Sequence, residues 1–265
     1  MSRIEATLKN VGVMGDKALI AYVMAGDPSL DETLSIVFEM EKAGADIIEI
    51  GIPFSDPIAD GPTIQQAADR ALQKGVTLTK VLDLVKTLRR QTKIPLILMT
   101  YCNPIYAFGL ENFFKAARRN GVNGIIIPDL PIEEARDFIH QGRKHLIDLI
   151  FLVAPTTPPE RIEKILKAGS GFVYYVPVTG VTGTTLKDWA SISQRISALK
   201  EMTDRPVAAG FGISSPEEAS KIAGSADGII VGSALVRIIA TAPDNPNYLA
   251  KLSDLITSLK KAISK

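Results

Sequence analysis

Eight short apolar runs recur at roughly regular intervals along this chain, and helical patterns separate them. Each run is almost continuously apolar, which is typical of parallel strands that are buried on both faces. The predicted strands are residues 19–23, 46–51, 96–99, 124–127, 149–153, 172–176, 206–209 and 228–231. Such alternation predicts a (β/α)8 TIM barrel. The doubly wound Rossmann fold is the alternative, but no GxGxxG motif follows the first strand to support it.

The connections between these runs predict the helices. The long interval after the second strand holds two helical patterns, 63–73 and 78–90, so we expect an extra helix there. Another extra helix is expected after the last strand at 233–239, and a final helix at 248–263. Neither a linker nor a block of charge divides the sequence, which predicts one barrel domain over residues 1–265.

Charge and cysteine usage exclude several classes of function. The chain has 30 basic and 29 acidic side chains and a net charge of +1, which argues against a nucleic acid or an anionic membrane as partner. Its single cysteine, Cys102, allows no internal disulfide and fits a reducing compartment. His140 and His145 lie five residues apart in one helical pattern, on different faces. We therefore expect no metal site.

The cellular location is predicted from what the sequence lacks. No apolar run reaches the roughly 18 residues that a membrane-spanning helix needs. The first residues also lack the apolar stretch of a signal peptide. We expect the protein in the cytoplasm, or in the plastid stroma if a transit peptide has been removed.

Glu49 stands inside the second predicted strand, which otherwise consists mostly of isoleucine. An ionised carboxylate costs several kcal/mol to bury without partners. Strand alternation places Ile48 and Ile50 against the helices and Glu49 inside the barrel, at the strand end where barrel enzymes have their active sites. Burial should raise the pKa of Glu49 and suit it to proton transfer near neutral pH. A buried ion pair with lysine or arginine is the alternative.

Asp60 follows Glu49 on a loop that is rich in proline and glycine. It could supply the second acid of an active site. It could instead cap the next helix, with Pro62 in the first turn. Asp56, which precedes Pro57, has the sequence context of a turn or of a surface contact.

Glycine-rich segments follow the last three predicted strands, at residues 179–185, 209–215 and 231–234. Barrel enzymes often bind phosphate with these late loops and the N-terminus of a short extra helix. Gly212 would let backbone amides approach an anion, and Gly232 and Ser233 would begin the extra helix. None of the three segments contains lysine or arginine, so the amides and hydroxyls would hold the phosphate.

Several motifs together resemble one enzyme family. They are Gly26-Asp-Pro, Ala43-Gly-Ala-Asp, the run from Glu49 to Gln65, Tyr101-Cys-Asn-Pro, Pro128-Asp-Leu-Pro, Gly180-Val-Thr-Gly and Gly210-Phe-Gly-Ile-Ser-Ser. The chain resembles the tryptophan synthase alpha chain over nearly its whole length, and the long second-strand motif is the most specific part. The resemblance implies a lyase of tryptophan biosynthesis that cleaves indole-3-glycerol phosphate to indole and glyceraldehyde 3-phosphate by a retro-aldol reaction, without a metal or cofactor in this chain.

The resemblance also implies roles for three catalytic residues. Glu49 would protonate C3 of the indole ring and accept the proton of the glycerol hydroxyl. Asp60 would hold the indole N–H and stabilise the positive charge that develops there. Tyr174 matches an aromatic residue near the active site, although packing in the core would equally explain it.

A set of substrate-binding residues follows from the same resemblance: Tyr22, Ile64, Met99, Ile127, Thr182, Gly183, Phe211, Gly212, Gly232 and Ser233. The first four would line the apolar indole pocket, the glycines and Ser233 would contact phosphate, and Thr182 would lie on a mobile loop that closes over the substrate and contacts Asp60. Two positions depart from the family pattern. Tyr22 stands where phenylalanine is usual, and Val178 stands where arginine is frequent.

The implied partner is a beta chain that consumes indole with pyridoxal phosphate, in an alpha2beta2 assembly. Pro53, Asp56 and Asn103 would contact it, although turn formation would also explain these residues.

Three other functions remain open. They are a stand-alone lyase that releases indole, another phosphate-binding barrel such as a sugar-phosphate isomerase, and a non-catalytic regulatory subunit.

Overall fold

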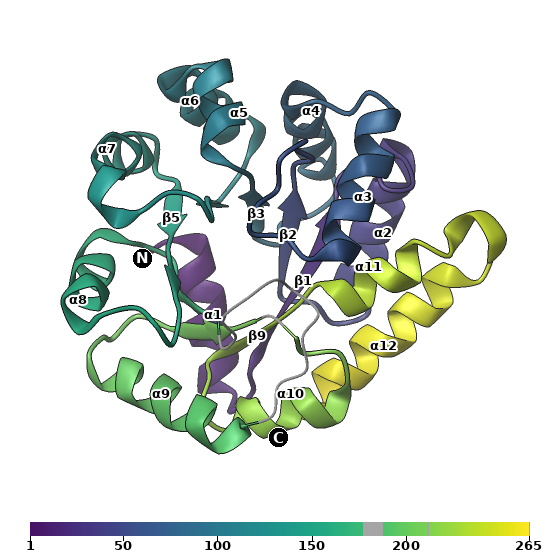
Figure 1. The fold of residues 1–265 in the computed structure, drawn as a ribbon. Coiled ribbons are helices and arrows are strands. Elements are labelled where there is room, and N and C mark those ends of the chain that lie inside the picture. The colour runs from purple at the N-terminus through teal and green to yellow at the C-terminus, as the bar shows by residue number, and fades with distance from the viewer. Residues whose placement is uncertain (177–187, 211, 265) are drawn as a thin grey trace.

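The strands form one parallel sheet that curves into a barrel with helices around it (Figure 1). The structure is a computed structural model, and it describes residues 1–176, 188–210 and 212–264. The strands are β1 (Ala18–Met24), β2 (Ile47–Gly51), β3 (Leu96–Met99), β4 (Gly124–Ile126), β5 (Asp148–Ile150), β6 (Leu152–Val153), β7 (Val173–Tyr175), β8 (Val207–Ala209) and β9 (Gly228–Val231). The predicted TIM barrel is confirmed. The prediction of a single domain over residues 1–265 stays a prediction.

One predicted strand, 149–153, is present as two. Its halves are β5 and β6, and Phe151 separates them. In the sheet order β5-β4-β3-β2-β1-β9-β8-β7-β6, these two strands are the two ends. The chain therefore pairs with β4 through its first half and with β7 through its second half, and this change of partner nearly closes the barrel.

The helices between the strands form the outer layer. They are α2 (Leu30–Lys42), α3 (Pro62–Gln73), α4 (Leu78–Leu88), α5 (Cys102–Phe108), α6 (Leu110–Asn120), α7 (Arg136–His145), α8 (Pro159–Ala168), α9 (Trp189–Glu201), α10 (Pro216–Ala223), α11 (Ser233–Ile239) and α12 (Tyr248–Ile263). The described residues also form two 3-10 turns, η1 (Ile132–Glu134) and η2 (Ala242–Asp244). The expected extra helices are present as α3, which accompanies α4 after β2, and α11, which follows β9.

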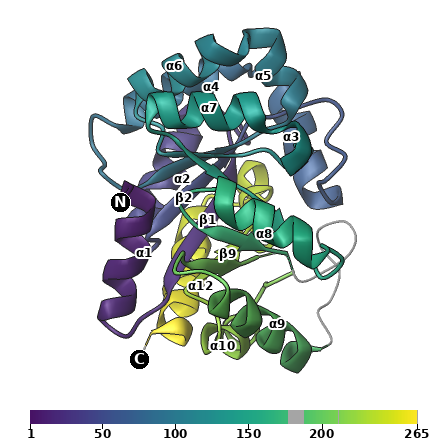
Figure 2. The same ribbon diagram turned by 90° about the vertical axis from the view of Figure 1, so that its left-hand side faces the viewer.

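An N-terminal helix that the sequence analysis did not predict, α1 (Arg3–Val13), covers the end of the barrel where the strands begin (Figure 2). Ser2 caps it in a capping box with Glu5. Ile4 and Leu8 are buried against Gly124 and Gly228, the first residues of β4 and β9. A Cβ atom at Gly124 would lie 2.7 Å from Ile4 Cδ1, so glycine is needed for this close approach. The opposite end of the barrel, where the strands finish, is the end at which the candidate site lies.

Candidate active site

Glu49 lies in the middle of β2, level with Tyr22 on β1 and Ile97 on β3. Its side chain is 1% exposed, and Oε2 has no hydrogen-bond partner within the described part of the chain. Burial, and then the negative charge of Asp60, raise the pKa of Glu49 to about 8. The ion pairs found among the described residues do not include Glu49, so they give no support to the alternative of a buried ion pair. At neutral pH this carboxyl group is protonated.

Asp60 lies on the loop between β2 and α3 and is 4% exposed. Tyr101 donates a hydrogen bond from Oη to Asp60 Oδ2 at 2.9 Å, and Tyr101 Oη accepts one from the Ala59 N–H at 3.2 Å. Burial raises the pKa of Asp60 to about 6, while the bond from Tyr101 opposes that rise. The helix cap of α3 is Gly61, so the alternative role of Asp60 as that cap is wrong.

Two tyrosines share the interior of the barrel with these acids. The pKa values of Tyr22 and Tyr174 are raised well above the ordinary value, first by burial and then by the charges of Glu49 and Asp60. Glycine makes room for each ring: a Cβ atom at Gly51 would overlap Tyr22 Oη, and one at Gly210 would lie 2.6 Å from Tyr174 Oη. The four ionisable side chains therefore form one buried cluster, which we call the acid–tyrosine cluster.

Apolar side chains stand around the same end of the barrel. Met99 ends β3, Ile127 follows β4, and Ile64 lies in the first turn of α3. All three are buried, as is Tyr22. The structure thus places Met99 and Ile127 at strand ends and Ile64 at the start of α3, on the side of the barrel where a flat apolar ligand would find apolar walls.

The predicted phosphate residues are only partly described. Gly212 has φ +82°, a conformation that favours glycine, and Gly232 is the N-cap of α11, which begins at Ser233. A Cβ atom at Gly232 would lie 3.6 Å from Tyr22 Cβ, so β1 lies between the start of α11 and Glu49 on β2. Thr182, Gly183 and Phe211, like Val178, lie outside the described residues.

The predicted partner contacts lie on the loop after β2, which carries Pro53 and Asp56, and at the start of α5, which carries Asn103. Asp56 and Asn103 are exposed, whereas Pro53 is buried. Two large apolar side chains near them are unusually open to solvent: Ile58 is 76% exposed and Tyr106 is 57% exposed. Exposed apolar side chains mark a protein interaction surface where they gather into a patch, so these two residues are candidates for such a surface.

Sequence reasoning missed Tyr101 as a site residue, although it named the motif that contains it. Tyr101 lies two residues after Met99, so simple alternation would have placed it on the inner face as well. It also missed the ion pair between Asp27 and Arg70, because those residues lie 43 positions apart and no local pattern joins them.

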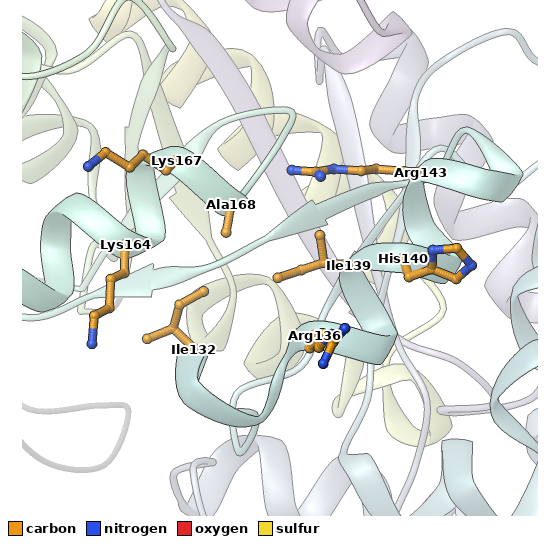
Figure 3. A pocket seen from close by; sticks show the side chains of 8 residues that line it. All are labelled: Ile132, Arg136, Ile139, His140, Arg143, Lys164, Lys167 and Ala168. Carbon is orange, nitrogen blue, oxygen red and sulfur yellow. The ribbon is translucent and has the colours of Figure 1, made fainter.

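A hollow of about 610 Å³ lies on the outer wall between α7 and α8 (Figure 3). Ile132, Ile139 and Ala168 face it, whereas the side chains of Lys164 and Lys167 extend away from these apolar groups. Its other lining residues are Arg136, His140 and Arg143. All of them belong to helices or to η1, so the hollow is separate from the acids on the barrel interior.

Metal binding and membrane insertion find no support among the described residues. No group of three or more histidine, cysteine, aspartate and glutamate side chains there could hold a metal ion. No helix in the described ranges has the length and apolar character to cross a bilayer.

Comparison with known proteins decides the family. The family model described as tryptophan synthase alpha chain matches residues 8–264. The chain belongs to the tryptophan synthase alpha chain family. It is 48% identical to the alpha chain of Geotalea uraniireducens over 238 residues, which cover 90% of this chain and 89% of the relative. It is 46% identical to that of Geotalea daltonii over the full length of both.

Solved structures agree with this assignment. The crystal structure of tryptophan synthase subunit alpha from Legionella pneumophila superposes on this chain with a TM-score of 0.93 at 38% sequence identity. The superposition covers 99% of this chain and 98% of the Legionella chain. The tryptophan synthase alpha chain is a lyase subunit of tryptophan biosynthesis. It cleaves indole-3-glycerol phosphate to indole and glyceraldehyde 3-phosphate, and the indole passes to a beta chain.

Proposed function

We propose that Glu49 and Asp60 perform this cleavage as an acid and a carboxylate with different protonation states. The observation that carries the proposal is the burial of both acids with different surroundings: Glu49 Oε2 has no hydrogen-bond partner among the described residues, whereas Asp60 accepts a hydrogen bond from Tyr101. In keeping with this, the pKa of Glu49 is raised to about 8 and that of Asp60 to about 6. At pH 7 the first is mainly protonated and the second mainly ionised. Two titratable groups whose environments separate their pKa values can divide acid and base roles in this way.

The first proton transfer goes from the Glu49 carboxyl group to C3 of the indole ring. Protonation there places positive charge on the ring nitrogen, and the Asp60 carboxylate stabilises that charge while it accepts the N–H hydrogen bond. The bond from Tyr101 holds Asp60 in place and favours its ionised form. Asp60 therefore acts on charge that is present during reaction and absent in the resting substrate.

The second step is the cleavage itself. Glu49, now a carboxylate, removes the proton of the glycerol hydroxyl on the carbon that is bonded to C3. The O–H electrons form the aldehyde C=O, the C–C bond breaks, and its electron pair returns to the ring and neutralises the nitrogen. Indole and glyceraldehyde 3-phosphate result, and Glu49 is protonated again. Atoms and charge therefore balance without an added oxidant or reductant.

Binding roles complete the proposal. Tyr22, Ile64, Met99 and Ile127 would hold the indole ring, since all four are buried beside the acids. The predicted phosphate contacts are Gly183, Gly212, Gly232 and Ser233, joined by Phe211 as a further substrate contact, with Thr182 on the closing loop. Tyr174 would contact the substrate from β7, as its place in the acid–tyrosine cluster allows.

We further propose an alpha2beta2 assembly in which the beta chain carries pyridoxal phosphate, and we place the protein in the cytoplasm. Asp56 and Asn103, which are exposed, would contact the beta chain, whereas Pro53, the third predicted contact, is buried. The exposed apolar side chains of Ile58, on the loop after β2, and Tyr106, in α5, support this surface. A subunit that cleaves substrate equally well alone and with the beta chain would be a stand-alone lyase instead.

The test is incubation of the purified chain with indole-3-glycerol phosphate and measurement of indole, with and without a beta chain. Glu49→Gln and Asp60→Asn should each reduce indole formation by about 10²–10⁴-fold. Glu201→Gln, at an exposed position on α9, is the matched control and should leave it unchanged. Full activity of both acid variants would contradict the proposed roles. Activation of a beta chain without any cleavage would favour the non-catalytic regulatory subunit.

A further inference from the structure

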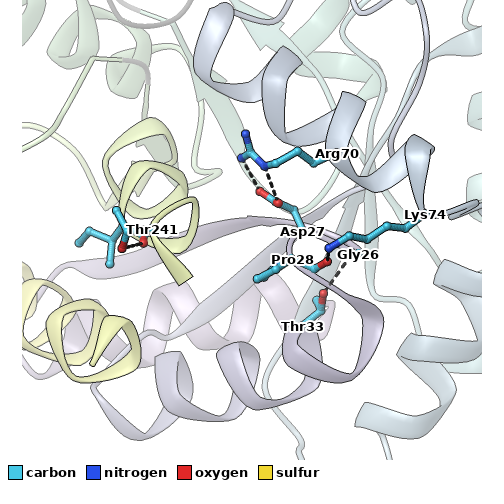
Figure 4. Close-up of polar contacts among 8 residues, drawn as sticks. Gly26, Asp27, Pro28, Thr33, Arg70, Lys74 and Thr241 are labelled. Atoms are coloured by element: carbon cyan, nitrogen blue, oxygen red, sulfur yellow. Dashed lines mark hydrogen bonds and ion pairs between the residues drawn. The ribbon is translucent and has the colours of Figure 1, made fainter. Parts of the chain in front are cut away.

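A partly buried ion pair ties the turn after β1 to the extra helix α3 (Figure 4). Arg70 lies in the last turn of α3 and donates two hydrogen bonds to Asp27, from Nε to Oδ1 at 2.8 Å and from Nη2 to Oδ2 at 2.7 Å. The Asp27 side chain is only 2% exposed, whereas that of Arg70 is 35% exposed. Such two-pronged pairing fixes orientation as well as distance.

Neighbouring contacts fasten the same turn. Lys74, just past α3, donates a hydrogen bond to the backbone oxygen of Pro28, and Gly26 N–H donates one to Thr33 Oγ1 on α2 at 3.0 Å. Gly26 has φ +86°, and a Cβ atom there would overlap the side chain of Val76. The turn is therefore packed against the segment that follows α3, and it offers Arg70 a fixed anchor.

The other end of α3 carries the catalytic loop. Asp60 precedes the helix by one residue, Gly61, and its backbone oxygen accepts a hydrogen bond from Gln65 Nε2 in α3 at 2.7 Å. Pro62 and Arg70 are eight residues apart, which corresponds to about 12 Å along a helix. A displacement of the helix at Arg70 would therefore be transmitted to Asp60. The helix also packs against α11, whose start is the predicted phosphate site.

We propose that Arg70 and Asp27 are positioning residues, which hold α3 so that Asp60 stays at its working distance from Glu49. The inference rests on the proposed role of Asp60. The barrel strand β2 holds Glu49 directly, whereas Asp60 lies on a loop that is held by the hydrogen bond from Tyr101 and, through Gln65, by α3. The placement of α3 therefore contributes to the separation of the two acids. The charge of Asp60 also raises the pKa of Glu49, so a change in separation changes the pH range of activity.

A second partly buried ion pair gives a matched control. Lys260 on α12 contacts Asp46 Oδ2 at 2.7 Å, with 21% and 18% of the two side chains exposed. Asp46 precedes β2, at the end of the barrel opposite the acids. Loss of this pair should affect stability alone. Comparison of Arg70→Met with Lys260→Met therefore separates a positioning role from a merely structural one.

The experiment measures kcat, KM and the pH profile of indole formation by the full chain with its beta chain, together with the Tm of each variant. Arg70→Met should lower kcat by about 10–100-fold, since a displacement of about 1 Å can have that effect. The upper limb of its pH profile should move to lower pH as Asp60 leaves Glu49. Lys260→Met should lower Tm without moving that limb.

Two further variants keep the result interpretable. Arg70→Met leaves Asp27 buried without its partner, which can itself unfold a protein. Arg70→Lys keeps the charge but not the two-pronged geometry, and it should fold and show an intermediate loss of kcat. Adding Asp27→Asn to Arg70→Met should restore Tm but not kcat.

The outcomes distinguish the two proposals. Wild-type kcat and pH profile in Arg70→Lys and in the double variant, with only Tm changed, would overturn the positioning role. Near-wild-type activity of Asp60→Asn would instead overturn the proposed function on which the inference rests. A kcat loss in Arg70→Lys beside an inactive Asp60→Asn supports both.

Discussion

Replacement of Glu49 by glutamine should make the protein more stable as it becomes less active. Burial and Asp60 raise the pKa of Glu49 from 4.5 to about 8. The folded state therefore retains a proton that the unfolded state releases once the pH exceeds 4.5. The wild-type protein accordingly loses stability between pH 4.5 and pH 8, and one pKa unit corresponds to about 1.4 kcal/mol.

The magnitude follows from that window. The window from pH 5 to pH 8 covers about three pH units, and as the pH rises through it the titration of Glu49 lowers the free energy of unfolding by about 4 kcal/mol. Glutamine has a similar shape and no ionisation, so the variant escapes this loss. The neighbouring Asp60 titrates in both proteins and largely cancels in the comparison.

Denaturant unfolding at pH 5 and pH 8 measures this difference. The free energy of unfolding of Glu49→Gln should exceed that of the wild type by about 4 kcal/mol more at pH 8 than at pH 5. Glu201→Gln on the exposed end of α9 should show no such trend. A Glu49→Gln difference that stays constant between the two pH values would refute the reasoning, since it would mean that Glu49 titrates alike in both states.

Three other predictions concern the same end of the barrel. Tyr101→Phe removes the bond that lowers the pKa of Asp60, so the lower limb of the kcat/KM pH profile should move to higher pH; an unchanged limb would contradict this. Gly51→Ala should raise KM by about tenfold or more because a Cβ atom there overlaps Tyr22 Oη, and adding Tyr22→Phe should restore part of the loss. Asp56→Ala should weaken activation by the beta chain more than turnover of the isolated chain; assays with and without the partner check this, and equal losses would count against the proposed surface.

The strands could be predicted because both of their faces are buried. A parallel strand between helices and a barrel core must be apolar almost throughout, so it can be recognised in the sequence as a short continuous apolar run. The division of residues 149–153 into β5 and β6 has no local sequence pattern, since it depends on the change of pairing partner from β4 to β7. The helix α1 was missed for a related reason: its role in covering the barrel depends on contacts with strands far along the chain.

The acids illustrate the same difference within the site. Alternation in β2 was enough to direct Glu49 inward, because a strand leaves a side chain only two faces to choose from. Asp60 lies on a loop, and its orientation depends on Tyr101, 41 residues away. Local sequence therefore left a helix cap open as an alternative; the structure has Gly61 as that cap, and the tertiary bond from Tyr101 orients Asp60. The burial of Pro53 likewise could not be read from its turn-like sequence.

The two acids need different kinds of support because their positions have different local stability. Glu49 is fixed by hydrogen bonding of β2 to strands on both sides. Asp60 lies on a loop, where opening generally requires less energy than in a core strand. The hydrogen bonds from Tyr101 and Gln65 stabilise the position of Asp60 on this loop. Gln65 belongs to α3, so its hydrogen bond fixes Asp60 only if that helix keeps its place. If the separation of the acids sets their protonation states, the anchoring of an added helix outside the barrel becomes part of the acid–base chemistry inside it.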